Sequence, residues 1–336
     1  MIKPPSFERG AFFILYYLPA GHYKKINYIQ TSPTVYIMPL KTKRLHTFCL
    51  VFLILLVFGN TLFHQFTYDD HSVIQDNTFI QSAENIKNLF SKEYFEQNPE
   101  KSWRPVVTMS YMLDFQIWKL RPFGYHFTNL VLHIFNVLLF YYLLLKIFKK
   151  EETALAAALL FAVHPLVCEP VNSVSFREDL LAFFFVLAAW NAFLRTQKHR
   201  ISGIILVSIF ALLGYASKES ALPLMLSFIV YRIVKGYKPG KAFWISQSVV
   251  LFVFLIIRFG VMVPEEQMVT RVLGGSPIAA AFQGGFLFLK SWRLFIIPFP
   301  MNADYVFWEI DSVITAESIT VIIFPLIYIL LAILTW

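Results

Sequence analysis

Residues 126–147 read HFTNLVLHIFNVLLFYYLLLKI, a run dominated by aliphatic and aromatic side chains. A helix that crosses the hydrocarbon of a membrane needs about 20 mostly apolar residues, so this run predicts a transmembrane helix. The whole chain has the same character, because 57% of its 336 residues are hydrophobic and only 15% are charged. A soluble domain averages about 45–50% apolar and about 25% charged residues. We therefore expect lipid to be the solvent for much of this protein.

Working outward from that run, the sequence predicts an all-α, polytopic bundle of about eight transmembrane helices. Several of them are short or interrupted by His, Pro or Gly, which is common where a site is built within a membrane. The predicted spans are approximately 46–64, 126–147, 153–170, 179–194, 201–216, 219–234, 242–260 and 315–336.

Lys and Arg gather in every second connection, and this alternation orients the predicted helices. Loops rich in these residues stay on the cytoplasmic side, so the remaining connections face outward. Membrane orientation thus accounts for the net charge of +8, and we do not expect nucleic acid as a partner. The clusters are Lys41, Lys43 and Arg44, then Lys146, Lys149 and Lys150, then Arg195, Lys198 and Arg200, and finally Arg232, Lys235, Lys238 and Lys241.

The chain divides into a tail and a membrane domain. Residues 1–40 hold only a short apolar patch with scattered Pro, and they predict a poorly ordered N-terminal extension; residues 41–336 form the membrane domain. Its first outward loop, 65–125, is too long for a simple connector, and long loops are usually functional. Apolar spacing in 84–95 predicts an amphipathic helix on the membrane surface. Because the sequence stops inside an apolar run, we expect the natural domain to continue past Trp336.

Ionisable side chains at membrane depth are costly and indicate function by default. The first cluster is Tyr68-Asp69-Asp70-His71, directly after the first span. Two adjacent carboxylates at a membrane exit can position an acceptor and remove its proton, which makes Asp69 and Asp70 candidate catalytic bases. The alternative is a solvated loop start in which an Asp caps a helix.

The second cluster combines His164 and Glu169 with Arg177 and Asp179. His164 is followed by a proline that breaks the third span, and a guanidinium near the outer surface can bind two phosphate oxygens at once. The alternative is a histidine and an ion pair that satisfy each other at a helix turn. A single His and Glu are too few ligands for zinc, so no metal site is predicted.

Two more clusters follow on the same predicted face. Lys218 and Glu219 occupy a very short turn, where Lys218 either meets a lipid phosphate or belongs to a plain connector. Arg293 and Asp304 lie around an interrupted apolar stretch that predicts an interfacial helix, with an anchoring rim as the alternative. A mixed pocket of carboxylates and cations beside the bilayer suits a substrate with a lipid tail, a phosphate and a polar acceptor.

The stretch from Tyr68 onward resembles the transmembrane O-mannosyltransferase family that targets cadherins, and its prokaryotic relatives. The resemblance covers most of residues 46–310, and it rests on several motifs that occur in the family's order. They are Tyr68-Asp69-Asp70, Ser102-Trp103-Arg104-Pro105, PFGYHFTNLVLHIFNVLL (122–139), HPLVCEPVNSVSFREDLLA (164–182), Ser217-Lys218-Glu219 and RLFIIPFPMNADY (293–305).

This resemblance implies a GT-C-like fold and an integral-membrane enzyme that uses a polyprenyl- or dolichyl-phosphate sugar on the extracytoplasmic face. The acceptor would be a protein or a glycan, and no soluble cofactor is expected. The membrane would be a bacterial or archaeal plasma membrane, or the endoplasmic reticulum in a eukaryote. By the family pattern, Asp69 or Asp70 is the base, and Arg177 and Lys218 hold the donor phosphate. The remaining expected substrate-binding residues are Arg104, His164, Glu169, Asp179, Glu219 and Asp304.

The sequence departs from the family pattern at several positions. Phe176 and Glu178 replace small residues beside Arg177, and Val167 stands where relatives often have a second His. Phe176 would narrow the site, and Glu178 adds a negative charge near the expected phosphate. These changes keep a non-catalytic scaffold or degenerate copy open as an alternative. A transporter of a lipid-linked substrate is another, although it would place its charges near the midplane.

Overall fold

A computed structural model describes residues 40–91, 93–94, 98, 102–196, 199–261, 290–299 and 301 of the chain. Every regular element within these ranges is a helix, which confirms the all-α prediction. The predicted tail (apart from its last residue, Leu40), the predicted span 315–336 and the candidate residue Asp304 lie outside the described residues.

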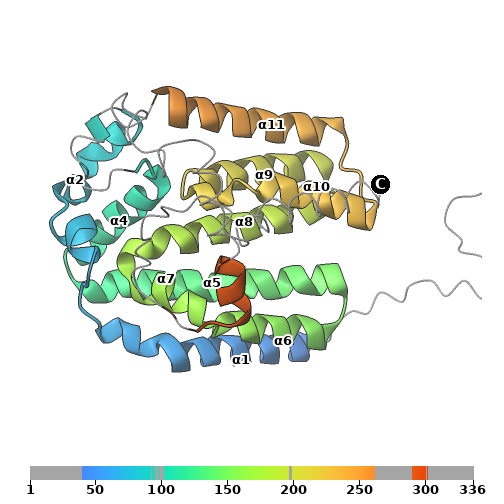
Figure 1. Cartoon of the computed structure of the whole chain (residues 1–336), viewed down its shortest axis with the longest axis horizontal. Helices are drawn as coiled ribbons and strands as arrows, with labels where there is room; N and C mark the ends of the chain where they lie inside the picture. Colours follow the sequence, from blue (N-terminus) through green and yellow to red (C-terminus); the bar gives the residue numbers. More distant parts are fainter. Residues whose placement is uncertain are drawn as a thin grey trace, which may run out of the picture. The chain divides into compact units, whose positions relative to one another are not determined.

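Long helices packed side by side form the body of the protein (Figure 1). Helix α8 packs between α9 and α5, and α5 also contacts α6 and α1. The helices are α1 (Leu40–Phe58), α5 (Pro122–Phe148), α6 (Glu151–Ala162), α8 (Arg177–Arg195), α9 (Arg200–Tyr215), α10 (Leu224–Lys235) and α11 (Lys241–Leu255).

Among the described residues, three helical stretches are long and apolar enough to cross a membrane: Thr42–Phe63, Pro122–Phe148 and Lys241–Arg258. A fourth span results if Glu151–Ala162 and Pro165–Asn172 are taken together, and these two helices meet at 52°. The predicted interruption of the third span is therefore present. The predicted total of about eight spans stays a prediction.

His164 and Pro165 explain the break in this fourth span. Proline disfavours a helical conformation at the residue before it, and His164 is accordingly extended (φ −64°, ψ 134°). The His164 side chain instead caps the next turn, since its Nδ1 accepts a hydrogen bond from the Leu166 N–H at 3.2 Å.

The basic connections after α5, α8 and α10 lie at one end of the bundle, and the long loop after α1 lies at the other (Figure 1). Contacts agree with this arrangement, because Lys146 near the end of α5 donates to Asn191 near the end of α8 at 2.7 Å. We call the end opposite the basic connections the outer end. A chain that folds back and forth in this way brings loops that are distant in sequence together there.

We expect the outer end to face away from the cytoplasm. In a chain carrying Cys49→Ala and Cys168→Ala, the exposed Asp76 and Lys238 are suitable single-cysteine positions. Asp76→Cys should react with an impermeant maleimide applied to the non-cytoplasmic side of sealed membranes, and Lys238→Cys only after permeabilisation. The reverse labelling pattern would contradict the orientation derived from the basic loops.

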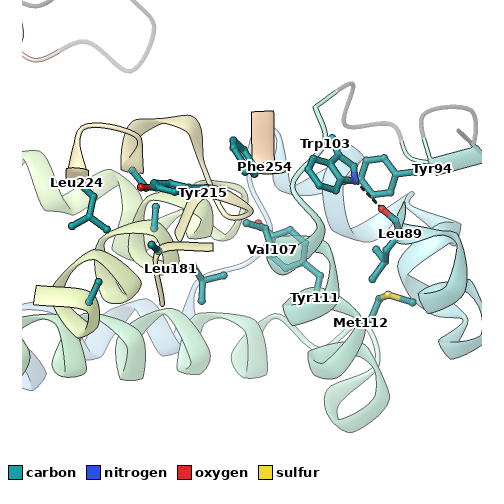
Figure 2. Packing of buried hydrophobic residues seen from close by; sticks show 14 of the residues in the cluster. Leu89, Tyr94, Trp103, Val107, Tyr111, Met112, Leu181, Tyr215, Leu224 and Phe254 are labelled. Carbon is teal, nitrogen blue, oxygen red and sulfur yellow. Dashed lines mark hydrogen bonds between the residues drawn. The ribbon is translucent and has the colours of Figure 1, made fainter. Parts of the chain in front are cut away.

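The segment between α1 and α4 (Pro105–Trp118) is folded onto the bundle by aromatic side chains (Figure 2). Trp103 Nε1 donates to the Leu89 carbonyl at 2.8 Å, and the Trp103 ring stacks on Phe254 of α11 with centroids 6.3 Å apart. Tyr94 Oη lies 2.8 Å from Thr108 Oγ1 of α4. These buried rings fix the backbone that carries the next residue, Arg104.

The predicted amphipathic helix in 84–95 is present as a 3₁₀ helix, Ala83–Phe90. Leu89 packs inward, whereas Ile86 and Phe90 are 52% and 61% exposed. Exposed apolar side chains suit contact with a membrane surface, and that location of the helix stays a prediction.

Candidate functional site

Six charged side chains from four parts of the chain form one ion-pair network at the outer end. Lys218 Nζ lies 2.7 Å from Asp179 Oδ2 and 2.9 Å from Glu178 Oε1. Arg104 pairs with that same Glu178 and also lies 3.9 Å from Glu219. Glu219 accepts a hydrogen bond from Arg258 at 2.6 Å. Acids and bases thus alternate along the network, in the order Asp179, Lys218, Glu178, Arg104, Glu219, Arg258.

Local structure explains how these residues are presented. Glu178 and Asp179 occupy the first turn of α8, where the positive end of the helix dipole stabilises carboxylates. Lys218 and Glu219 lie in the turn after α9, at the start of a 3₁₀ helix, Glu219–Ala221. Arg258 ends the apolar helix that begins with α11. The sequence prediction that distant charged segments converge at the outer end therefore holds for Arg104, Asp179, Lys218 and Glu219.

Lys218 and Glu219 are both held in their charged forms. Burial acts to lower the pKa of Lys218, but the Asp179 and Glu178 carboxylates outweigh it and raise the pKa above its ordinary value. Burial acts to raise the pKa of Glu219. Hydrogen bonds from its own backbone and from Arg258, with the charges of Arg258 and Arg104, outweigh this effect and lower the pKa. The site therefore presents a permanent ammonium group beside two carboxylates.

A cavity of about 780 Å³ is lined by Asp179, the carboxylate paired with Lys218. Its volume falls in the range of small-molecule sites, about 300–1,000 Å³. Its charged and polar lining residues are Asp179, Glu169, His133, Asn136, Ser220, Ser227 and Ser291, and the rest of the lining is apolar. The apolar side chains are Phe161, Leu166, Val167, Pro170, Leu180, Ala182, Phe183, Val186, Trp190, Ala221, Pro223 and Leu224. Such a cavity can take the apolar part of a lipid while its ionic group stays at the charged rim.

The two candidate bases, Asp69 and Asp70, have opposite environments. Asp70 is fully buried, and its carboxylate accepts from the backbone N–H groups of Ser175 (2.7 Å) and Thr67 (3.2 Å) and from the Ser173 hydroxyl (3.2 Å). Asp69 is exposed, and among the described residues its carboxylate has no hydrogen-bond or ion-pair partner. Asp70 thus ties the loop to the segment before α8, whereas the Asp69 side chain is open to solvent.

Arg177 lies in a different place from the one expected of a phosphate ligand. Its side chain is 0% exposed, and its Nη1 lies 2.7 Å from Asp114 Oδ2. Nε donates to Asn129 Oδ1 at 2.7 Å, Nη2 donates to the Tyr125 carbonyl at 3.0 Å, and the guanidinium lies 4.7 Å from the Tyr111 ring centroid. Because all three guanidinium nitrogens already have partners within the protein, we assign Arg177 a role in joining α8 to α4 and α5.

The other predicted residues divide between the cavity and its edge. Glu169 is exposed and lines the cavity, and its role in substrate binding stays a prediction. His164 lies within hydrogen-bonding distance of the Phe295 carbonyl, 3.0 Å from Nε2, and its ring stacks on Phe295 at 5.4 Å. His164 therefore holds the 290–297 segment against the broken span, and Ser291 of that segment lines the cavity.

Sequence reasoning missed Arg258 and Asp114, and it treated Glu178 only as a departure from a pattern. A lone charge inside an apolar stretch was the available signal for both missed residues. Within the ranges that the structure describes, no group of three or more His, Cys, Asp or Glu side chains is placed to hold a metal ion.

Apolar helices of membrane length and the all-helical architecture of the described residues define the class as a helical membrane protein. Residues 105–263 match the family described as dolichyl-phosphate-mannose-protein mannosyltransferase. The comparisons confirm the resemblance to the TMTC-like, GT-C mannosyltransferase family.

Several animal proteins are similar to this region. Human protein O-mannosyl-transferase TMTC3 is 32% identical over 145 residues, which cover 42% of this chain and 16% of that protein. The Caenorhabditis elegans protein O-mannosyl-transferase F38B6.6 is 31% identical over 165 residues, covering 47% of this chain and 23% of its own length. Drosophila melanogaster protein O-mannosyl-transferase Tmtc1 is 31% identical over 173 residues, which cover 50% of this chain and 20% of that protein. The chain therefore matches less than a quarter of each relative, and no solved structure matches it.

Proposed function

We propose that this chain is an integral-membrane glycosyltransferase that moves a mannose-like sugar from a polyprenyl-phosphate carrier to a protein or glycan acceptor on the extracytoplasmic face. The observation that carries the proposal is the largely apolar cavity of about 780 Å³, one of whose lining residues, Asp179, is paired with the Lys218 ammonium group at 2.7 Å. The chemistry of such a donor matches this arrangement, since its tail is apolar and its phosphodiester is a single negative charge.

The residues have distinct roles in the proposed transfer. The carrier's lipid part lies along the apolar wall, and Lys218 binds a phosphate oxygen. Asp69 accepts the proton of the acceptor hydroxyl while that oxygen bonds to the anomeric carbon of the sugar. The bond between that carbon and the phosphate oxygen breaks in the same displacement, and the lipid phosphate leaves with the electron pair. Glu169 and Asp179 line the cavity and can accept hydrogen bonds from sugar hydroxyls.

The placement of charge favours this proposal over the alternatives. A transporter needs its polar site near the bilayer midplane, whereas this network lies among loops and helix ends at the outer end of the bundle. A scaffold has no need of a cavity lined by the carboxylates of Glu169 and Asp179.

Lys218→Gln should weaken binding of a polyprenyl-phosphate mannose probe by about tenfold to a hundredfold, because a charge-assisted hydrogen bond to phosphate is lost. Binding is measured with the labelled probe and the full chain in detergent. Lys238→Gln is the matched control, since Lys238 is exposed at the opposite end of the bundle. Equal affinity in wild type and Lys218→Gln would remove Lys218 from the donor site.

A further inference from the structure

One carboxylate, that of Glu178, lies between the cations Lys218 and Arg104. Glu178 Oε1 lies 2.9 Å from Lys218 Nζ, and its other oxygen pairs with Arg104. The Glu178 side chain is only 9% exposed. Two cations from separate segments that converge on one group form an arrangement suited to the oxygens of a phosphate. Here the protein places its own anion between them.

The Glu178 carboxylate is held in one position. It lies in the first turn of α8, and Arg104 holds it from a backbone anchored by the buried Trp103. Asp179, the other acid on Lys218, is 35% exposed and can turn toward water. A phosphate that binds Lys218 therefore meets the negative charge of Glu178 at short range, whichever way Asp179 turns.

The consequence depends on the charge of the phosphate. A lipid-linked sugar is a phosphodiester with one negative charge. The carrier released after transfer is a phosphate monoester, which carries nearly two charges at neutral pH because its second pKa is about 6. Coulomb repulsion is proportional to ligand charge, so a fixed carboxylate opposes the released carrier about twice as strongly in free energy.

We propose that Glu178 is a specificity-determining residue that makes the site prefer the singly charged donor phosphodiester over the doubly charged spent carrier. This inference rests on the proposed function. It gives a role to the presence of Glu178 where the family pattern has a small residue: Glu178 promotes release of the lipid phosphate after transfer. Glu178 acts through charge and takes no part in the chemical step.

The test compares the affinities of polyprenyl-phosphate mannose and polyprenyl phosphate for the full chain at pH 7.5. Affinity depends exponentially on free energy. When the ligand charge doubles, the repulsion energy doubles, and the fold-increase in affinity on removing it is squared. In Glu178→Gln, donor affinity should rise by about fivefold and carrier affinity by about 25-fold, which narrows their ratio about fivefold. Glu178→Ala is the second variant, in case the glutamine amide at this position disturbs folding. Glu152→Gln, an exposed site at the opposite end, controls for net charge.

Each outcome decides something specific. A larger gain for the carrier than for the donor supports the proposal. Equal gains, or no gain for either probe with donor binding intact, overturn the role of Glu178 and leave the proposed function standing. A chain in which neither wild type nor variant binds the donor overturns both. A purely structural Glu178 would lower the thermal midpoint without changing the affinity ratio.

Discussion

Asp69→Asn is expected to lower sugar transfer by about 10²–10⁴-fold while the protein stays folded, because general-base catalysis contributes about that factor. Asparagine keeps the size of the side chain but cannot accept the acceptor's proton. Asp69 is exposed at the outer end, so its replacement breaks no described side-chain contact. Transfer is measured with membranes, labelled polyprenyl-phosphate mannose and identification of the product, alongside the thermal midpoint of the purified chain.

Asp70→Asn is the matched comparison for that experiment. Asp70 accepts three hydrogen bonds through both carboxylate oxygens, and an amide NH₂ in place of one oxygen faces an N–H donor. We expect a loss of about 1–3 kcal/mol in stability, with any loss of activity following from it. Full transfer by Asp69→Asn would disprove the proposed base. A stable but inactive Asp70→Asn would instead assign the chemistry to Asp70.

Arg177→Met should destabilise the protein by about 3–5 kcal/mol, because it leaves the Asp114 carboxylate buried without its charge partner. Arg177 is 0% exposed, and the Asp114 side chain is only 7% exposed. The loss is measured as a shift in unfolding of the detergent-solubilised chain. Arg121→Met, at an exposed position just before α5, is the control.

A second variant separates structure from donor binding. Replacing both partners, Arg177→Met with Asp114→Leu, removes the uncompensated charge and should recover most of the stability, since apolar groups often replace buried ion pairs without loss. The recovered double variant should still bind the donor probe, because Arg177 is enclosed by α4 and α5 and does not line the cavity. Loss of donor binding in a stable double variant would return Arg177 to the phosphate site.

Sequence patterns that extend over a few residues predicted the all-helical class and the positions of several helices. The run 126–147 lies within α5, and the break at His164-Pro165 separates α6 from the turn that follows. Apolar composition and the backbone limits of proline act within a few residues, so they can be interpreted without knowing what lies nearby. The apolar spacing near Leu89 likewise indicated a helix but not its 3₁₀ form.

The candidate site depended on partners that a linear pattern does not contain. Arg177 and Glu178 are adjacent, yet one is sealed against Asp114 of α4 and the other lies between Arg104 and Lys218. Asp69 and Asp70 are also adjacent, yet one faces solvent and the other is buried. In a turn or a helix, neighbouring side chains leave the backbone in different directions, and their environment depends on which distant segment packs there. The chemical types at the outer end were therefore visible in the sequence. The role of each charge followed from the packing of loops that are distant in the sequence, as between Asp70 and Ser175, which are 105 residues apart.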